Sequence, residues 1–187
     1  MKPTTPTTRA ATALAVLATL TALLLSGCLL EPFTGAEVIL ELGTSSANSG
    51  DIANRPAEHY ELFAEIHGGL VSVGKFRIDE NLNAVAFPSG EKIGAANQLG
   101  EGLPESGIRF RTEVNLEDAE QVLITIEDNG ETDLAPSERI IGRSVLLPGP
   151  RSALVGDIEG EVPTVLGKAP LVSSRVAILL TDDRVYF

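Results

Sequence analysis

The chain has 187 residues, and its 26 acidic and 14 basic side chains give it a formal net charge of −12 at neutral pH. So acidic a surface repels nucleic-acid phosphates and anionic lipid headgroups, which excludes nucleic acid as an expected partner. The single cysteine leaves no intramolecular disulfide to hold a fold together. We therefore expect one domain that is stabilised by an apolar core.

The first 27 residues have the three-part layout of a secretory signal. Lys2 and Arg9 supply a basic start, an uncharged run rich in Ala, Leu and Thr follows, and small residues precede the only cysteine. The ending resembles the lipobox of bacterial lipoproteins, Leu25-Ser26-Gly27-Cys28. The resemblance implies that the chain is cleaved before Cys28, that the Cys28 thiol receives a diacylglyceryl group, and that this lipid holds the protein on a membrane.

Cleavage would leave residues 28–187, with 12 basic and 26 acidic side chains and a formal charge of −14. In the sorting rule of enteric bacteria, aspartate directly after the lipidated cysteine retains a lipoprotein in the inner membrane. This chain has Leu29 at that position, which implies transport to the outer membrane, if the host has one. The expected location is therefore the cell envelope. An uncleaved N-terminal anchor is the alternative, although the apolar run is shorter than the roughly 20 residues of a spanning helix.

Residues 28–58 are expected to form a lipidated N-terminus and a flexible linker, and residues 59–187 the folded domain. The segment 43–56 is rich in Ser, Gly, Asn and Ala, which is typical of a linker or an irregular loop. Ahead of it, residues 38–42 form either a strand or an apolar patch near the membrane. We place the start of the domain at about His59.

The first two strands of the domain are expected to form a hairpin. From Tyr60 to Ile66 every second residue is apolar, with Phe63 as the exception on the other face, which predicts a strand with one mainly apolar face. Gly68 and Gly69 are the expected two-residue turn, because primed hairpin turns need positive φ. In the return strand, residues 70–78, the apolar phase slips partway, which predicts a β-bulge around Gly74 and Lys75.

Five more strands are expected, separated by turn-forming Gly, Pro, Asn and Asp residues. They are residues 107–113, 121–127, 139–147, 152–158 and 174–181. One helical turn is expected at residues 115–120, with Asn115 as its cap. Short strands joined by turns predict an all-β fold, an antiparallel β-sandwich that is immunoglobulin-like or similar.

Part of this domain resembles the exported domain of anti-sigma-K factors. The resemblance covers residues 59–137 and rests on motifs that occur in the family's order: Tyr60-Glu61-Leu62-Phe63, the glycine pair, residues 71–76, the strand 122–127 and Pro136-Ser137. Phe63 stands where the family often has tryptophan. The resemblance implies the fold and an exported location, but we expect no sigma-binding segment and therefore no regulatory activity of that kind.

Groups suited to catalysis are sparse in the sequence. His59 and His67 are expected as exposed strand residues too far apart to share a metal, and no Gly-x-Ser-x-Gly elbow occurs. The loop 127–133 supplies weak calcium candidates in Asp128, Asn129 and Asp133, without the alternating order of an EF-hand loop, so that an acidic turn is the favoured interpretation. We predict no catalytic residues, no metal site and no cofactor.

The sequence therefore predicts a lipid-anchored envelope protein whose domain is a non-enzymatic interaction or sensing module. Its expected partners are the membrane, through the lipid on Cys28, and a protein of the envelope, while the oligomeric state stays open. Two alternatives remain, a purely structural envelope protein and an envelope hydrolase that uses carboxylates. The hydrolase would require carboxylates from separate strands to face one concave pocket.

Overall fold

The computed structural model describes residues 35–44, 52–81, 83–93, 103–104, 107–130 and 135–180. Among these, the regular structure consists of β-strands and one short 3₁₀ helix. The elements are β1 (Ala36–Glu41), β2 (Glu58–Ile66), β3 (Gly69–Ile78), β4 (Ala84–Ala86), β5 (Ile108–Thr112), β6 (Ala119–Asp128), β7 (Ile140–Val145), β8 (Leu147–Pro148), η1 (Pro150–Ser152), β9 (Leu154–Asp157), β10 (Glu159–Thr164), β11 (Gly167–Pro170) and β12 (Arg175–Leu180).

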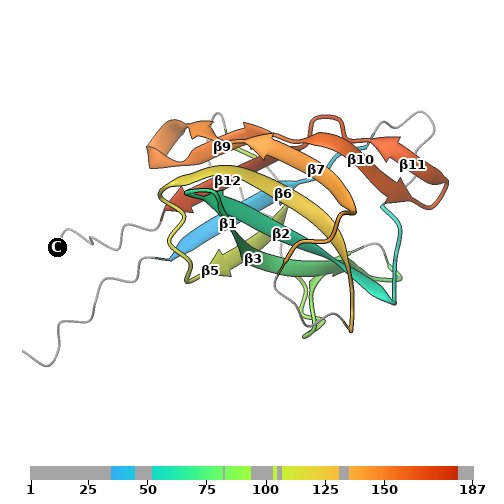
Figure 1. Ribbon diagram of the computed structural model, residues 1–187. Coiled ribbons are helices and arrows are strands. Elements are labelled where there is room, and N and C mark those ends of the chain that lie inside the picture. The colour runs from blue at the N-terminus through green and yellow to red at the C-terminus, as the bar shows by residue number, and fades with distance from the viewer. Residues whose placement is uncertain are drawn as a thin grey trace, which may run out of the picture. The chain divides into compact units, whose positions relative to one another are not determined.

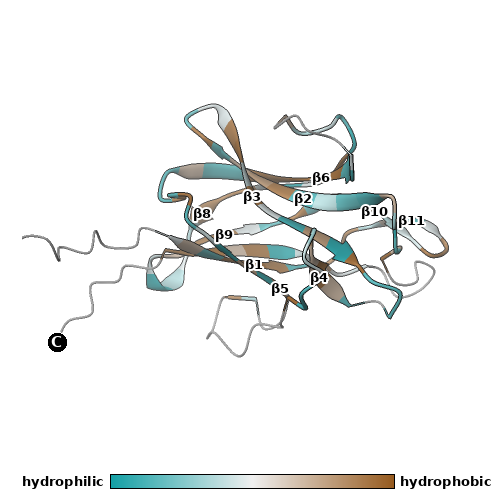
Figure 2. Cartoon of the chain, turned by 90° about the horizontal axis from the view of Figure 1, so that it is seen from below, coloured by the Kyte–Doolittle hydropathy of each residue, from teal (hydrophilic) through white to brown (hydrophobic). Residues whose placement is uncertain are grey.

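The strands form two antiparallel sheets that pack against each other, which confirms the predicted all-β sandwich. The first sheet has the order β5-β1-β12-β9-β8, and the second has the order β11-β10-β7-β6-β2-β3-β4. Figure 1 shows β2, β6 and β7 crossing in front of β1 and β12, and Figure 2 shows the two layers from another side. The chain passes from one sheet to the other at several connections, for example between β5 and β6.

The core lies between the sheets and takes alternate residues from each strand. Tyr60, Leu62 and Ala64 of β2 are buried, as their spacing predicts. The Tyr60 ring stacks on Phe76 with centroids 5.2 Å apart, and Phe76 meets Phe110 of the first sheet at 5.8 Å. Burial raises the pKa of the Tyr60 hydroxyl to about 12, and this hydroxyl donates to the carbonyl of Ala53 at 3.3 Å.

The folded domain includes β1, so the expected domain start at His59 is wrong. β1 lies inside the first sheet, paired with β12 on one side and β5 on the other, and Val38, Ile39 and Leu40 are fully buried. The physical reason is that its partners lie some 70 and 140 residues further along the chain, for example Arg109 and Ala177 beside Ile39. Such pairing leaves no local signal in the sequence.

The described parts of the expected linker are also attached to the domain. The Gly43 amide donates to Ser174 Oγ at 2.9 Å, and a Cβ on Gly43 would overlap the carbonyl oxygen of Val172. Further on, Ile52 bridges to Thr164, and the Ala53 amide donates to the carbonyl of Pro163. Residues 45–51 of that segment lie outside the described residues.

The hairpin and its bulge each lie one residue before the predicted position. His67 and Gly68 form the turn, with φ of 52° and 77°, and Gly69 already pairs with Ile66. Histidine enters the left-handed region more readily than most residues, so His67 can take the first turn position. The register of the hairpin is then set by the burial of alternate β2 side chains rather than by the glycine pair. The register shift makes Val73 the extra residue, because Leu62 pairs with Gly74 and Phe63 with Ser72.

Other differences from the predicted elements are local. Asn115 accepts a hydrogen bond from the Glu117 amide at 3.0 Å, but the residues form a turn rather than a helix, and β6 begins at Ala119. The β10–β11 hairpin was not predicted, because prolines at positions 163 and 170 interrupt any strand pattern. Both prolines lie toward the β11 edge of the second sheet, where a missing amide is tolerated.

Candidate functional site

The structure describes two of the residues that the sequence put forward as sites, Asp128 and Asn129. Cys28 and Asp133 lie outside the described residues. Asp128 Oδ1 accepts from Arg139 Nη2 at 2.8 Å, and Asn129 Oδ1 lies 3.3 Å from His59 Nδ1. The two side chains therefore bind different neighbours. Among the described residues no group of three or more His, Cys, Asp or Glu side chains is placed to hold a metal ion.

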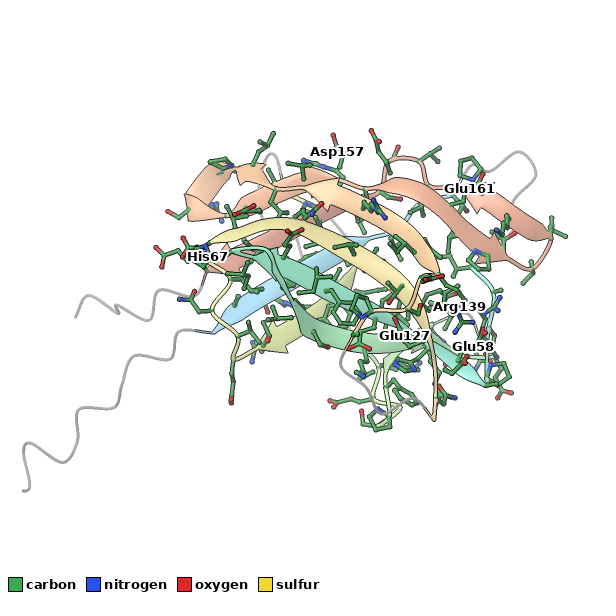
Figure 3. All side chains as sticks on the ribbon, in the orientation of Figure 1. Glu58, His67, Glu127, Arg139, Asp157 and Glu161 are labelled. Atoms are coloured by element: carbon green, nitrogen blue, oxygen red, sulfur yellow. The ribbon has the colours of Figure 1, made fainter. Side chains whose placement is uncertain are left out.

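Arg139 instead joins a small ionic network at one end of β2. Its Nη1 lies 2.5 Å from Glu58 Oε1, and Arg55 donates to the other carboxylate oxygen of Glu58. The hydrogen bond from Arg55, with that from Arg139, holds the pKa of Glu58 below its usual value. Figure 3 shows Glu58 and Arg139 close together and His67 at the opposite end of the molecule.

The two histidines have unlike surroundings. His67 is exposed in the hairpin turn, 3.4 Å from Asp118. His59 is only 3% exposed, which corrects the expectation of an exposed strand histidine. The ring of Phe87, just after β4, stacks on the His59 imidazole with centroids 4.3 Å apart, and Arg77 lies over the Phe87 ring. The connection after β4 therefore covers this part of the outer face of the second sheet.

Under that cover lies an outer-face polar cluster, which consists of His59, Glu61, Thr125 and Glu127. Cross-strand pairing places His59 opposite Glu127 and Glu61 opposite Thr125. All four are nearly or fully buried. Glu61 and Glu127, from neighbouring strands, are thus together, which is one part of what the hydrolase alternative requires.

Each carboxylate of the cluster is satisfied by other groups. Glu61 accepts from the Ser72 hydroxyl, and its Oε2 lies 3.0 Å from Lys75 Nζ. Glu127 Oε1 accepts from the Thr125 hydroxyl and from the Ser137 amide at 2.9 Å.

The histidine of the cluster is oriented by Asn129. The Asn129 amide nitrogen donates to the Pro56 carbonyl, so its oxygen accepts from His59 Nδ1. His59 Nε2 lies 3.6 Å from Glu61 Oε2, which is beyond hydrogen-bond distance. His59 Nε2 is buried without a hydrogen-bond partner among the described residues, while the other polar groups of the cluster bind Thr125 or neighbouring residues. Because the cluster is covered and both carboxylates are engaged, its arrangement is that of a structural network.

An open cavity lies elsewhere, on the side of the sandwich where β3 and β4 face β5. Its volume is about 500 Å³, in the range of small-ligand sites. We call it the basic groove and define it by its lining, Val73, Gly74, Lys75, Ala86, Glu91, Lys92, Ile93, Arg109, Phe110 and Arg111. The lining contains neither carboxylate of the outer-face polar cluster. Lys75 connects the two sites, because it lines the groove and its Nζ also contacts Glu61 of the cluster.

The floor of the groove is formed where the two sheets touch. Phe110 of β5 lies against Gly74 of β3, and a Cβ on Gly74 would overlap the phenyl ring. A bare backbone at this position therefore lets the edge of one sheet approach the other closely. Phe110 is 7% exposed and its ring packs against Phe76, so this part of the floor has little room to move.

The walls of the groove carry four cations and one carboxylate, the reverse of the balance in the whole chain. Arg109 Nη2 donates to Glu37 Oε2 at 2.5 Å. Arg111 is held more loosely, with Nε 3.6 Å from Glu37 Oε1 and a side chain 82% exposed. Lys92 is exposed. The groove therefore offers cationic groups that a bound anion can reach.

These groove residues were not singled out from the sequence. Arg109 and Arg111 alternate on a predicted strand, which was a visible signal of one charged face. Lys75 and Lys92 gave none, because only the packing of β3, β4 and β5 brings them near the arginines.

Comparisons with protein-family models, with characterised proteins and with solved structures find no match. Within the part of the chain that the structure describes, no helix has the length and apolar character to span a membrane.

Proposed function

We propose that this protein is a binding module of the bacterial cell envelope, anchored by a lipid on Cys28, that recognises an anionic partner in the basic groove. The observation that carries the proposal is the concentration of Lys75, Lys92, Arg109 and Arg111 around an open cavity of about 500 Å³. In a chain of formal charge −12, such a local reversal of sign favours an anionic partner at close range.

The anchoring part of the proposal rests on the sequence. The lipobox-like ending at Cys28 and the basic, apolar and small-residue layout before it support export and lipidation. The resemblance to the exported domain of anti-sigma-K factors supports a sensing or interaction role outside the inner membrane. Catalysis has no part in the proposal.

Photo-crosslinking in intact cells tests the binding role. A photoreactive amino acid in place of Arg111 should give an adduct with an envelope component, while the same replacement at the exposed Lys168 of β11 should not. Adducts at neither position, or equal adducts at both, would contradict a binding role for the groove. Membrane fractionation of Cys28→Ala, which should release the protein from the membrane, tests the anchor separately.

A further inference from the structure

Two strand edges without partners border the basic groove. β5 is the last strand of the first sheet, and its outer edge pairs with no other described strand. β4 pairs with β3 only at residues 76–78, so the edge of β3 before Lys75 also has no strand partner among the described residues. Figure 1 shows β5 running beside β3 on this side of the molecule. Free edges of this kind present unpaired N–H and C=O groups in register for a further strand.

We propose that the basic groove binds an extended peptide segment with acidic residues at alternate positions, which adds as a strand to the free edge of β5. This inference rests on the proposed binding role of the groove and names the chemistry of its partner. Strand addition takes affinity from main-chain hydrogen bonds and specificity from alternate side chains. β5 has five residues, which at about 3.3 Å per residue spans about 17 Å.

The side-chain pattern of β5 specifies the acidic alternation. Arg109 and Arg111 project from the same face of β5, with Phe110 on the other face toward the core. A strand paired with β5 places its own alternate residues beside these arginines, where opposite charges stabilise cross-strand pairs. Carboxylates suit this position because guanidinium groups bind them through two parallel hydrogen bonds.

Glu91 is the one carboxylate of the lining, and the other carboxylates nearby are engaged away from this position. Glu37 lies on β1, on the inner side of the arginines, and binds Arg109 more closely than Arg111. Glu61 holds Lys75 from the outer-face polar cluster. Asp79 accepts hydrogen bonds from the Asn81 and Asn83 amides within its own turn. The exposed Arg111 and Lys92 therefore carry the recognition.

The test uses the full-length protein and a fluorescent peptide of about seven residues, long enough to cover β5. The peptide has glutamate at alternate positions with valine between, and its fluorescence anisotropy reports binding. We expect saturable binding that weakens with added salt and weakens about tenfold or more in Arg111→Glu and in Lys92→Glu. Lys168→Glu, an exposed strand lysine on β11, makes the same charge change away from the groove and should bind as the wild type does.

A second peptide separates strand addition from charge attraction. It has the same sequence with methyl groups on alternate amide nitrogens, which keep the charge and remove the donors to a strand edge. It should bind about tenfold or more weakly. If it binds equally well, or if glutarate displaces the parent peptide at equal concentration, strand addition is wrong, while the groove remains an anion-binding site as proposed.

Other results contradict more of the proposal. Equal binding of a lysine–valine peptide would show that the acidic pattern is not recognised. If the glutamate peptide and glutarate both fail to bind the wild type, both this inference and the anionic partner of the proposed function are overturned.

Discussion

Replacing Gly74 with alanine tests the contact that joins the two sheets at the floor of the basic groove. The new Cβ would overlap Cδ1 of Phe110 and lie 2.9 Å from its Cγ and Cε1. The ring has little room to move, because it is 7% exposed and packs against Phe76. Overpacking of this kind costs about 1–3 kcal/mol. The lower chain entropy of unfolded alanine offsets about 0.5–1 kcal/mol of that loss.

The net destabilisation expected for Gly74→Ala is therefore about 1–2 kcal/mol, a measurable part of a domain stability of about 5–15 kcal/mol. Phe110→Ala removes the ring and should cost about 3–5 kcal/mol. In the double variant the alanine methyl at position 74 no longer meets a ring. Its loss should then be smaller than the sum of the two single losses by the overpacking term, about 1–3 kcal/mol.

Urea denaturation of the wild type, both single variants and the double variant provides the four free energies of unfolding. The m-values should agree, which shows that the same transition is compared in each case. Additive losses, within about 0.5 kcal/mol, would refute the contact between Gly74 and Phe110. The close approach of β3 and β5 at the floor of the groove would then be wrong.

Three further predictions concern the turn, the ionic network and the anchor. Gly68→Val forces a β-branched residue to φ near 77° and should cost about 1–3 kcal/mol, whereas Gly69→Val, in the strand, should cost clearly less; equal urea midpoints would contradict the observed turn. The lowered pKa of Glu58 means that its carboxylate stabilises the fold above its unfolded pKa of about 4.3 and loses this contribution as the pH falls through the lower folded value. Glu58→Gln should therefore be about 0.5–1 kcal/mol less stable than the wild type at pH 7, with the difference disappearing toward pH 2; the network is partly exposed, which keeps the effect small. Finally, Cys28→Ala should leave the chain uncleaved and without lipid, and intact mass spectrometry that finds a mature N-terminus at any other residue would contradict the lipobox interpretation.

The sequence alone determined the fold class and the local geometry of its best-patterned segment. Alternation from Tyr60 to Ile66 set the buried face of β2, and the phase slip before Phe76 placed a bulge to within one residue. Such patterns are readable because side chains alternate along a strand and the face between the two sheets is filled by apolar ones.

Tertiary structure decided what depends on residues far apart in the chain. β1 belongs to the domain because β5 and β12 pair with it, and His59 is covered by Phe87, which follows it by 28 residues in the chain. The basic groove has the same origin, since its lining comes from residues 73–75, 86, 91–93 and 109–111. Cations that local sequence marks as ordinary exposed charges form the proposed recognition surface when packing brings them around one cavity. Neither periodicity nor composition contains that information, because both describe neighbours along the chain, whereas the groove is built from neighbours in space.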